Sequence, residues 1–170
     1  MKIIILASIF LLVLANIAIA LDTDTQKHSS CSYCGMDRAK FAHSRMLIEY
    51  DDGTTVGTCS LRCAAIDLAN NIDKSPKTIG VGDYYSKKLI DAEKAYWVMD
   101  DSKPGVMTGR AKWAFENKNS VEKFIKENGG VLATFDDAIK AAYEDMYKDT
   151  KQIRERRKMK RSMPMKEHKS

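Results

Sequence analysis

The sequence is poor in histidine, with three among 170 residues, and it lacks the arrangements on which most enzyme sites depend. No serine, histidine and aspartate set, no pair of catalytic carboxylates and no glycine-rich phosphate loop can be identified. These absences argue against a hydrolase and against a nucleotide-binding protein. We therefore expect a protein that is not an enzyme.

A cysteine is also missing directly after the N-terminal apolar run, which disfavours a lipid-anchored protein. Residues 3–15 are apolar apart from Ser8, Lys2 precedes them, and Ala18-Ile19-Ala20 forms a small-x-small cleavage pattern. These features are typical of an export signal over residues 1–20. The alternative is an uncleaved membrane anchor, because residues 3–20 are just long enough to span a bilayer. Both forms imply a periplasmic protein.

Positive charge is concentrated towards the C-terminus. Residues 148–170 contain ten lysine or arginine residues against three acidic ones, a balance of +7, whereas residues 1–147 carry −2. We divide the exported chain into a flexible lead-in over 21–30, one domain over 31–147 and a basic tail over 148–170. Such a tail suits peripheral contact with anionic lipid or an acidic partner, and the plain alternative is a solvated, partly disordered end.

The spacing of apolar residues predicts an α+β protein with two similar ββαβ units and a long C-terminal helix. Ser60, Asn119 and Asp136 are the expected first residues or caps of its three helices. An Asp-Gly pair predicts the turn of the first hairpin. The predicted elements are strands over 45–50 and 54–58, a helix over 59–70, strands over 78–81 and 94–99, an extended stretch within 106–115, a helix over 119–128, a strand over 131–135 and a terminal helix.

Four cysteines form two closely spaced pairs. Cys31 and Cys34 form a Cys-x-x-Cys-Gly knuckle, in which two sulfurs turn towards one point. Cys59 and Cys63 lie four residues apart at the expected start of a helix, so they share one face. A knuckle, a hairpin and a helix-start pair together predict a treble-clef-like site for a soft metal, Cu(I) or Zn(II). Two alternatives remain: two disulfides formed in an oxidising compartment, and a Cys-x-x-Cys redox pair.

Methionine is abundant, with nine residues, and two lie where packing does not require them. Met36 follows the knuckle glycine, and Met107 lies in a glycine-flanked loop, so both are candidate Cu(I) ligands. The alternative is that each covers a hydrophobic edge. His28 and His43 flank the knuckle and either could join a metal site. Further candidate soft ligands lie in the basic tail, namely Met159, Met163, Met165 and His168.

Several segments resemble the NosL family, which comprises accessory proteins of nitrous oxide reductase. The opening motif is Cys31-Ser-Tyr-Cys34-Gly35-Met36, followed by Ala39-Lys40. Further matching segments are residues 91–98, 105–109, 114–115 and 124–132. The resemblance implies a periplasmic Cu(I) carrier whose partner is a client copper enzyme or another copper carrier. It also implies an α+β fold of two β-hairpin-helix units and identifies Met107 with the family's glycine-flanked methionine.

Two features depart from that family pattern. Cys59 and Cys63 are not matched by many family members and instead resemble the Cys-x₃-Cys ending of YHS and TRASH metal modules. The basic, methionine-bearing tail has no counterpart in the family pattern. These departures leave a structural zinc site or a disulfide-stabilised interaction module as the alternative to copper delivery.

Overall fold

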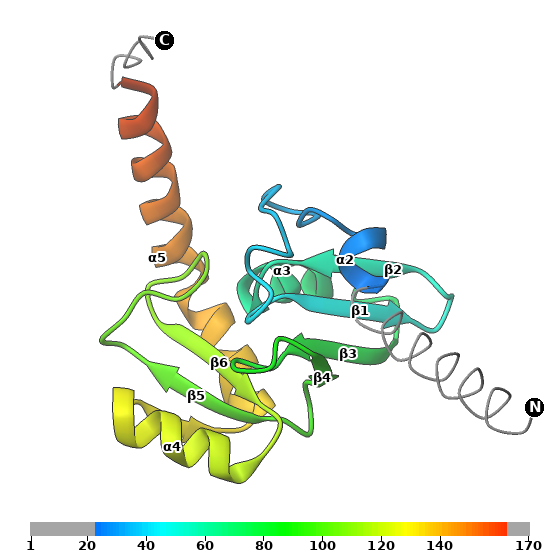
Figure 1. The fold of residues 1–170 in the computed structure, drawn as a ribbon. Coiled ribbons are helices and arrows are strands. Elements are labelled where there is room, and N and C mark those ends of the chain that lie inside the picture. The colour runs from blue at the N-terminus through cyan, green and yellow to red at the C-terminus, as the bar shows by residue number, and fades with distance from the viewer. Residues whose placement is uncertain (1–22, 163–170) are drawn as a thin grey trace, which may run out of the picture.

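The computed structural model describes residues 23–162, so the expected export signal and residues 163–170 lie outside the described part of the chain. The strands form two sheets, and helices pack around them (Figure 1). The elements are α2 (Thr23–Lys27), β1 (Met46–Tyr50), β2 (Thr55–Thr58), α3 (Leu61–Asn70), β3 (Pro76–Gly82), β4 (Leu89–Asp91), β5 (Tyr96–Asp100), β6 (Ala111–Phe115), α4 (Lys118–Asn128), β7 (Val131–Ala133) and α5 (Phe135–Ser162).

The two sheets repeat one topology. In the first unit the strand order is β2-β1-β3, with β4 added at the edge, and in the second it is β6-β5-β7. In both units the first strand is central and pairs antiparallel with the next strand and with the strand that follows the helix. The predicted α+β fold with two ββαβ units is therefore confirmed. The short strand β4 was not predicted.

The first unit packs one face of its sheet against helices. Met46, Ile48 and Tyr50 alternate along β1 and are fully buried, as expected for a strand with one face in the core. Ala64 and Ala65 of α3 belong to the same core cluster. Gly53, with a φ of 80°, permits the tight turn between β1 and β2. The hairpin therefore forms where the sequence predicted it.

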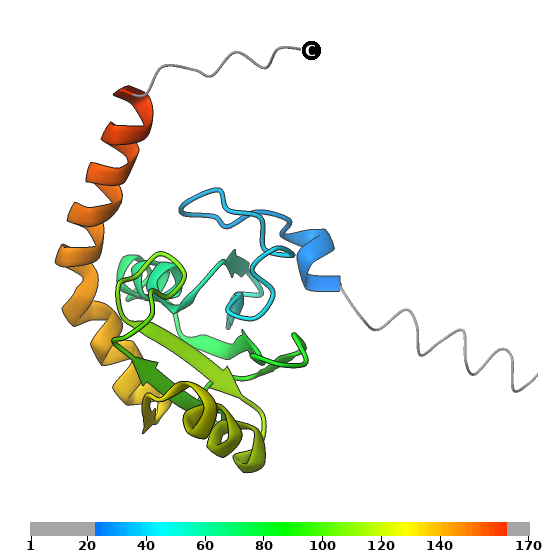
Figure 2. The same cartoon turned by 60° about the vertical axis from the view of Figure 1, so that its left-hand side comes forward.

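The second unit is covered on both faces. Consecutive side chains of a strand point to opposite faces. Trp97 of β5 packs against Phe135 of α5, with ring centroids 6.0 Å apart, whereas Val98 joins the cluster that contains Phe124 of α4. Helix α5 also packs against α3, so it connects the two units (Figure 2).

Several predicted boundaries are wrong. The helix expected from Cys59 begins at Leu61, with Ser60 as its N-cap. The lead-in over 21–30 is not a plain flexible segment, because Thr23–Lys27 forms α2. The cap of α4 is Asn117 rather than Asn119, since the Asn117 side chain accepts a hydrogen bond from the Ser120 N–H. The expected strand over 131–135 ends at Ala133, and α5 begins at Phe135 without Asp136 as its cap, because Thr134 and Asp137 hydrogen-bond reciprocally there.

A further wrong boundary concerns the tail. The predicted domain end at residue 147 falls within α5, which continues to Ser162. Half of this helix therefore lies in the segment assigned to the basic tail. None of the helices within residues 23–162 combines the length and apolar character needed to span a bilayer.

Candidate metal centre

The sulfur atoms of all four cysteines converge on one point. Their Sγ atoms lie within 4.8 Å of one another, although Cys31 and Cys34 precede β1 whereas Cys59 and Cys63 flank the start of α3. The Sγ atoms of Cys34 and Cys59 are 3.4 Å apart, and those of Cys59 and Cys63 are 3.9 Å apart. A tetrahedral ion with bonds of about 2.3 Å to sulfur requires sulfur–sulfur distances of roughly 3.8 Å. The donor set and its spacing therefore fit a soft metal ion.

The knuckle is shaped by its backbone. The Cys31 N–H donates to the Met36 carbonyl at 2.8 Å, and the Gly35 N–H donates to the Cys31 carbonyl at 2.9 Å. Gly35 has a φ of 74°, which a residue with a side chain rarely adopts. The Ser32 N–H and hydroxyl both donate to the Gly57 carbonyl of β2. This anchor holds the knuckle against the hairpin that leads to Cys59.

A buried carboxylate links the knuckle to α3. Asp67 lies four residues after Cys63 and is 2 % exposed. The Tyr33 hydroxyl, from the middle of the knuckle, donates to Asp67 Oδ1 at 2.6 Å. The Tyr50 hydroxyl of β1 donates to Asp67 Oδ2 at 2.5 Å. Asp67 therefore fixes the knuckle relative to the helix that carries Cys63.

The four thiols differ in exposure. Cys31, Cys59 and Cys63 are buried, at 3 %, 0 % and 0 %, whereas Cys34 is half-buried. None of them is disulfide-bonded in the structure. Cys34 lines a pocket of about 170 Å³ together with Cys63 and Met107. An ion held by the four sulfurs would therefore reach solvent on the side of Cys34.

The thiols also differ in how readily they ionise. Hydrogen bonds from the thiols of Cys34, Cys59 and Cys63 lower the pKa of Cys31. Cys31 acts to raise the pKa of Cys34, but hydrogen bonds from Cys59 and Cys63 outweigh it, and that pKa is about 7. The nearby Cys31 and then Cys34 sulfurs raise the pKa values of Cys59 and Cys63. Only a bound cation stabilises all four sulfurs as thiolates.

The two candidate methionines lie beside this cluster. Met36 and Met107 both line a larger pocket of about 510 Å³, and Met107 also lines the smaller pocket of Cys34 and Cys63. Met107 has a φ of 62°, a left-handed conformation that is costly for a residue with a side chain. Backbone strain of this kind is often retained where a side chain must be held in one position, which supports a functional role for Met107.

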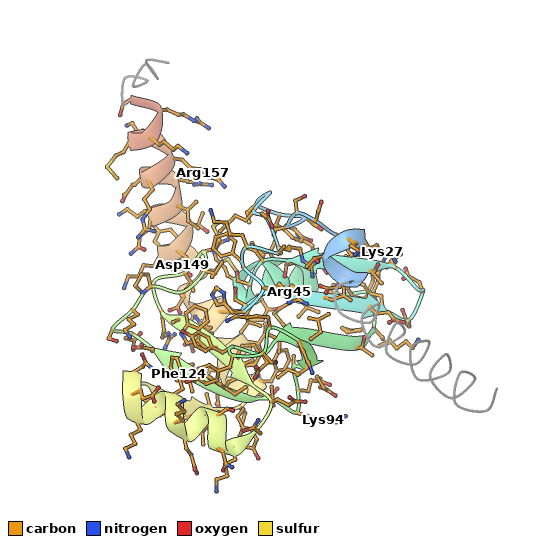
Figure 3. All side chains as sticks on the ribbon, viewed as in Figure 1. Lys27, Arg45, Lys94, Phe124, Asp149 and Arg157 are labelled. Atoms are coloured by element: carbon orange, nitrogen blue, oxygen red, sulfur yellow. The ribbon has the colours of Figure 1, made fainter. Side chains whose placement is uncertain are left out.

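Helix α5 holds the methionine loop in place. The Gly109 N–H donates to Asp149 Oδ1 at 2.8 Å, and Arg110 and Lys112 both donate to Asp145 at 2.8–3.0 Å. Figure 3 shows Asp149 where α5 passes the body of the protein. These two aspartates lie four residues apart, so they share a helix face. The loop that carries Met107 is therefore fixed to α5.

The two histidines within residues 23–162 do not join the sulfur cluster. His28 Nε2 lies 3.0 Å from the Thr55 hydroxyl. His43 lines the larger pocket and packs against Trp113, with ring centroids 5.2 Å apart. Burial and then Lys87 lower the pKa of His43, which favours the neutral imidazole. His43 is thus near Met36 and Met107 but outside the group of four cysteines.

Sequence reasoning singled out the four cysteines, which the structure brings together, and the two methionines, which lie beside them, but not the residues that position them. The proximity of Asp67 to the site could have been predicted, because Asp67 lies four residues after Cys63 and both therefore share one face of the helix. Asp149 was hidden within the segment interpreted as a basic tail, and Asp145 was an ordinary polar position of the predicted terminal helix. Met159 is exposed on the last turns of α5, and the structure does not describe Met163, Met165 and His168.

Comparison with known proteins identifies the family of this chain. No curated protein matches the sequence. The crystal structure of the copper chaperone NosL from Shewanella denitrificans has the same fold, with a TM-score of 0.50 and 24 % sequence identity over 63 % of this chain and 87 % of that chain. The NosL family profile matches residues 22–143, which is most of the protein. The chain therefore belongs to the NosL family.

Proposed function

We propose that this protein binds Cu(I) through Cys31, Cys34, Cys59 and Cys63 and delivers it to a partner copper protein in the periplasm. The observation that carries the proposal is the convergence of four sulfurs with one member, Cys34, open to a pocket that also contains Met107. The related structure from Shewanella denitrificans is described as a copper chaperone. Family membership supports nitrous oxide reductase as the client.

Delivery would proceed by ligand exchange. Cu(I) is the cargo, and it keeps its oxidation state while sulfur ligands are replaced one at a time. The half-buried Cys34 is the first sulfur that an incoming ligand can replace, and Met107 and Met36 lie on the same side. Thioethers bind Cu(I) but hold Zn(II) poorly, so methionines beside the exit favour copper as the cargo.

A structural zinc site is the second candidate. Four thiolates, three of them buried, would close the coordination shell of Zn(II) and leave no position for exchange. A thiol oxidoreductase is disfavoured, because Cys31 is buried and the Cys-x-x-Cys motif does not open a helix.

Titration under anaerobic conditions tests the proposal. The exported protein is purified with reduced thiols, and Cu(I) is added in competition with a colorimetric chelator of known affinity. We expect one tightly bound Cu(I) per chain and displacement of any bound zinc. Binding no tighter than that of a variant without cysteines, or zinc that Cu(I) cannot displace, would overturn it.

Replacing Met107 by leucine should slow the release of Cu(I) without weakening its binding. Leucine keeps a similar volume but cannot act as a ligand during exchange. Stopped-flow transfer to a thiol peptide measures the rate, which we expect to fall about tenfold or more at unchanged affinity. Met146→Leu, in the other core cluster, is the control and should leave the rate unchanged. Equal rates for both variants would exclude Met107 from the transfer route.

Removing the Tyr33 hydroxyl should weaken the metal site through positioning alone. Tyr33→Phe frees the knuckle from Asp67, so we expect Cu(I) affinity to fall about tenfold, as for other changes in residues that orient ligands. Tyr50→Phe is a matched control, since it removes the second hydrogen bond to the same carboxylate but from β1. It should lower stability and leave affinity nearly unchanged. If both variants lose affinity in proportion to stability, Tyr33 has no positioning role.

A further inference from the structure

The last turns of α5 extend beyond the body of the protein. The helix has 28 residues, about 42 Å at 1.5 Å per residue. Buried residues end at Asp149, and every residue from Arg154 to Ser162 is exposed. Figures 1 and 2 show this end rising away from both sheets. We call residues 154–161 the basic arm.

The basic arm carries one sign of charge almost exclusively. Of its eight residues, six are lysine or arginine and one is Glu155. Within residues 23–162, none of these six basic side chains forms an ion pair. Like charges three and four residues apart destabilise a helix. Four of them line one shallow pocket of about 390 Å³, namely Arg154, Arg157, Lys158 and Arg161.

This charge lies beside the candidate metal exit. Arg154 and Arg157 line the pocket of Cys34, Cys63 and Met107. Arg157 also lines the larger pocket of Met36 and Met107. In Figure 3 Arg157 lies on α5 beyond Asp149, within the projecting turns. A partner seated on the basic arm would therefore meet the same surface on which the metal leaves.

We propose that the basic arm is a docking surface for an acidic patch on the protein that exchanges metal with this one. The inference rests on the proposed function and adds the chemistry of the partner. The arm begins beyond the family match, which ends at residue 143, so it belongs to this chain rather than to the shared domain. Complementary charge raises the rate of encounter and orients the partner, which here brings acceptor ligands to Cys34.

A protein partner fits this surface better than a membrane. Helices that bind membranes carry a large apolar face opposite their charges. Within residues 154–161 the only apolar side chain is that of Met159. A bilayer on this side would also cover the metal exit without offering an acceptor ligand. The arm is polar on all sides, as expected for contact with a charged protein surface.

Two synthetic acceptor peptides test the proposal. Both contain Cys-x-x-Cys as the Cu(I) acceptor, one followed by a run of glutamates and the other by glutamines. The Cu(I)-loaded protein should transfer faster to the glutamate peptide, about tenfold or more at low salt, and the advantage should shrink as salt is added. Equal rates for the two peptides overturn the inference.

Two charge-reversal variants locate the effect. Lys158→Glu with Arg161→Glu changes the arm at positions that do not line either methionine pocket. Lys123→Glu with Lys126→Glu makes the same net change on α4, at the opposite end of the molecule (Figure 1). The arm variant should lose the preference for glutamate and the α4 variant should keep it. Equal losses in both variants contradict a local docking surface.

Further measurements distinguish failure of the proposed Cu(I) binding from failure of the proposed docking surface. Chelator titration of the same samples reports Cu(I) affinity, so a protein that does not bind Cu(I) refutes the proposed function. Tight Cu(I) binding without a preference for the glutamate peptide refutes only the docking surface. The third measurement is cosedimentation of the protein with phosphatidylglycerol vesicles. If the unmodified protein binds the vesicles, the arm variant does not, and neither prefers the glutamate peptide, the partner of the arm is a membrane and not a protein.

Discussion

Cys59→Ser should reduce Cu(I) affinity by more than the roughly 10–100-fold that changes in outer residues cost, whereas Cys34→Ser should leave Cu(I) affinity close to that of the unmodified protein. Cys59 is fully buried, and its sulfur lies 3.4 Å from that of Cys34 and 3.9 Å from that of Cys63. Serine at this position cannot supply a soft donor, and solvent cannot replace it. The buried part of the site then has two thiolates.

Cys34→Ser differs because it leaves the three buried thiolates in place. Cu(I) accepts fewer than four soft ligands, but Zn(II) in structural sites is almost always four-coordinate. We therefore expect Cys34→Ser to retain Cu(I), to lose most of its zinc affinity and to transfer Cu(I) at least as fast as the unmodified protein, because the first sulfur to be replaced is already gone. Chelator competition for each metal, together with stopped-flow transfer, measures the three quantities.

The contrast between the two variants also separates copper delivery from structural zinc. If the site is structural, both substitutions remove one of four equivalent ligands, so both should lower zinc affinity and thermal stability alike. Similar losses of Cu(I) affinity in the two variants would also contradict the proposed order of exchange. A spectrum of the Co(II)-substituted protein checks that each variant still gathers its remaining sulfurs.

Local spacing explains why the cysteine cluster was predictable. Cys31 and Cys34 are joined by a knuckle, and Cys59 and Cys63 lie on either side of Ser60, the N-cap of α3. Only the hairpin therefore had to bring the two pairs together. The repeated ββαβ pattern followed from apolar alternation and turn residues in the same way. Both predictions depend on residues that are close in sequence.

The residues that support the site could not be predicted from local spacing. Tyr33 reaches Asp67 across 34 residues, and Gly109 reaches Asp149 across 40. In the sequence these aspartates are ordinary polar positions, because only tertiary packing decides that they are buried. Asp24 illustrates the same limit most clearly, since it lies in the segment interpreted as a flexible lead-in.

Asp24 is the central charge of a buried network. Its carboxylate accepts hydrogen bonds from Arg38 at 2.8 Å and from Arg45 at 2.9 Å, and the side chains of all three residues are at most 8 % exposed. Arg38 also donates to the carbonyls of Thr58, which precedes Cys59, and of Met46 in β1. The network therefore joins α2 to the strands that lead to the metal centre.

Asp24→Asn should strongly destabilise the fold. Removing one partner of a buried ion pair costs roughly 3–5 kcal/mol, a large share of the roughly 5–15 kcal/mol that stabilises a typical domain. Here one change leaves two buried guanidinium groups without their carboxylate. Urea unfolding of the reduced, metal-free protein measures the loss. Asp52→Asn, which removes an exposed carboxylate 2.9 Å from Lys74, is the matched control and should leave the midpoint nearly unchanged.

The pH dependence of stability gives an independent check on the same network. Burial acts to raise the pKa of Asp24, but hydrogen bonds and charge from Arg45 and Arg38 outweigh it and hold the pKa below its ordinary value. The stabilisation is therefore complete above the pKa of the unfolded chain and is lost as the pH falls through the lower pKa of the folded state. In acid, the free energies of unfolding of the unmodified protein and of Asp24→Asn should converge. A constant difference between them down to low pH, or a loss no greater than that of Asp52→Asn, would show that the Asp24 charge does not stabilise the fold.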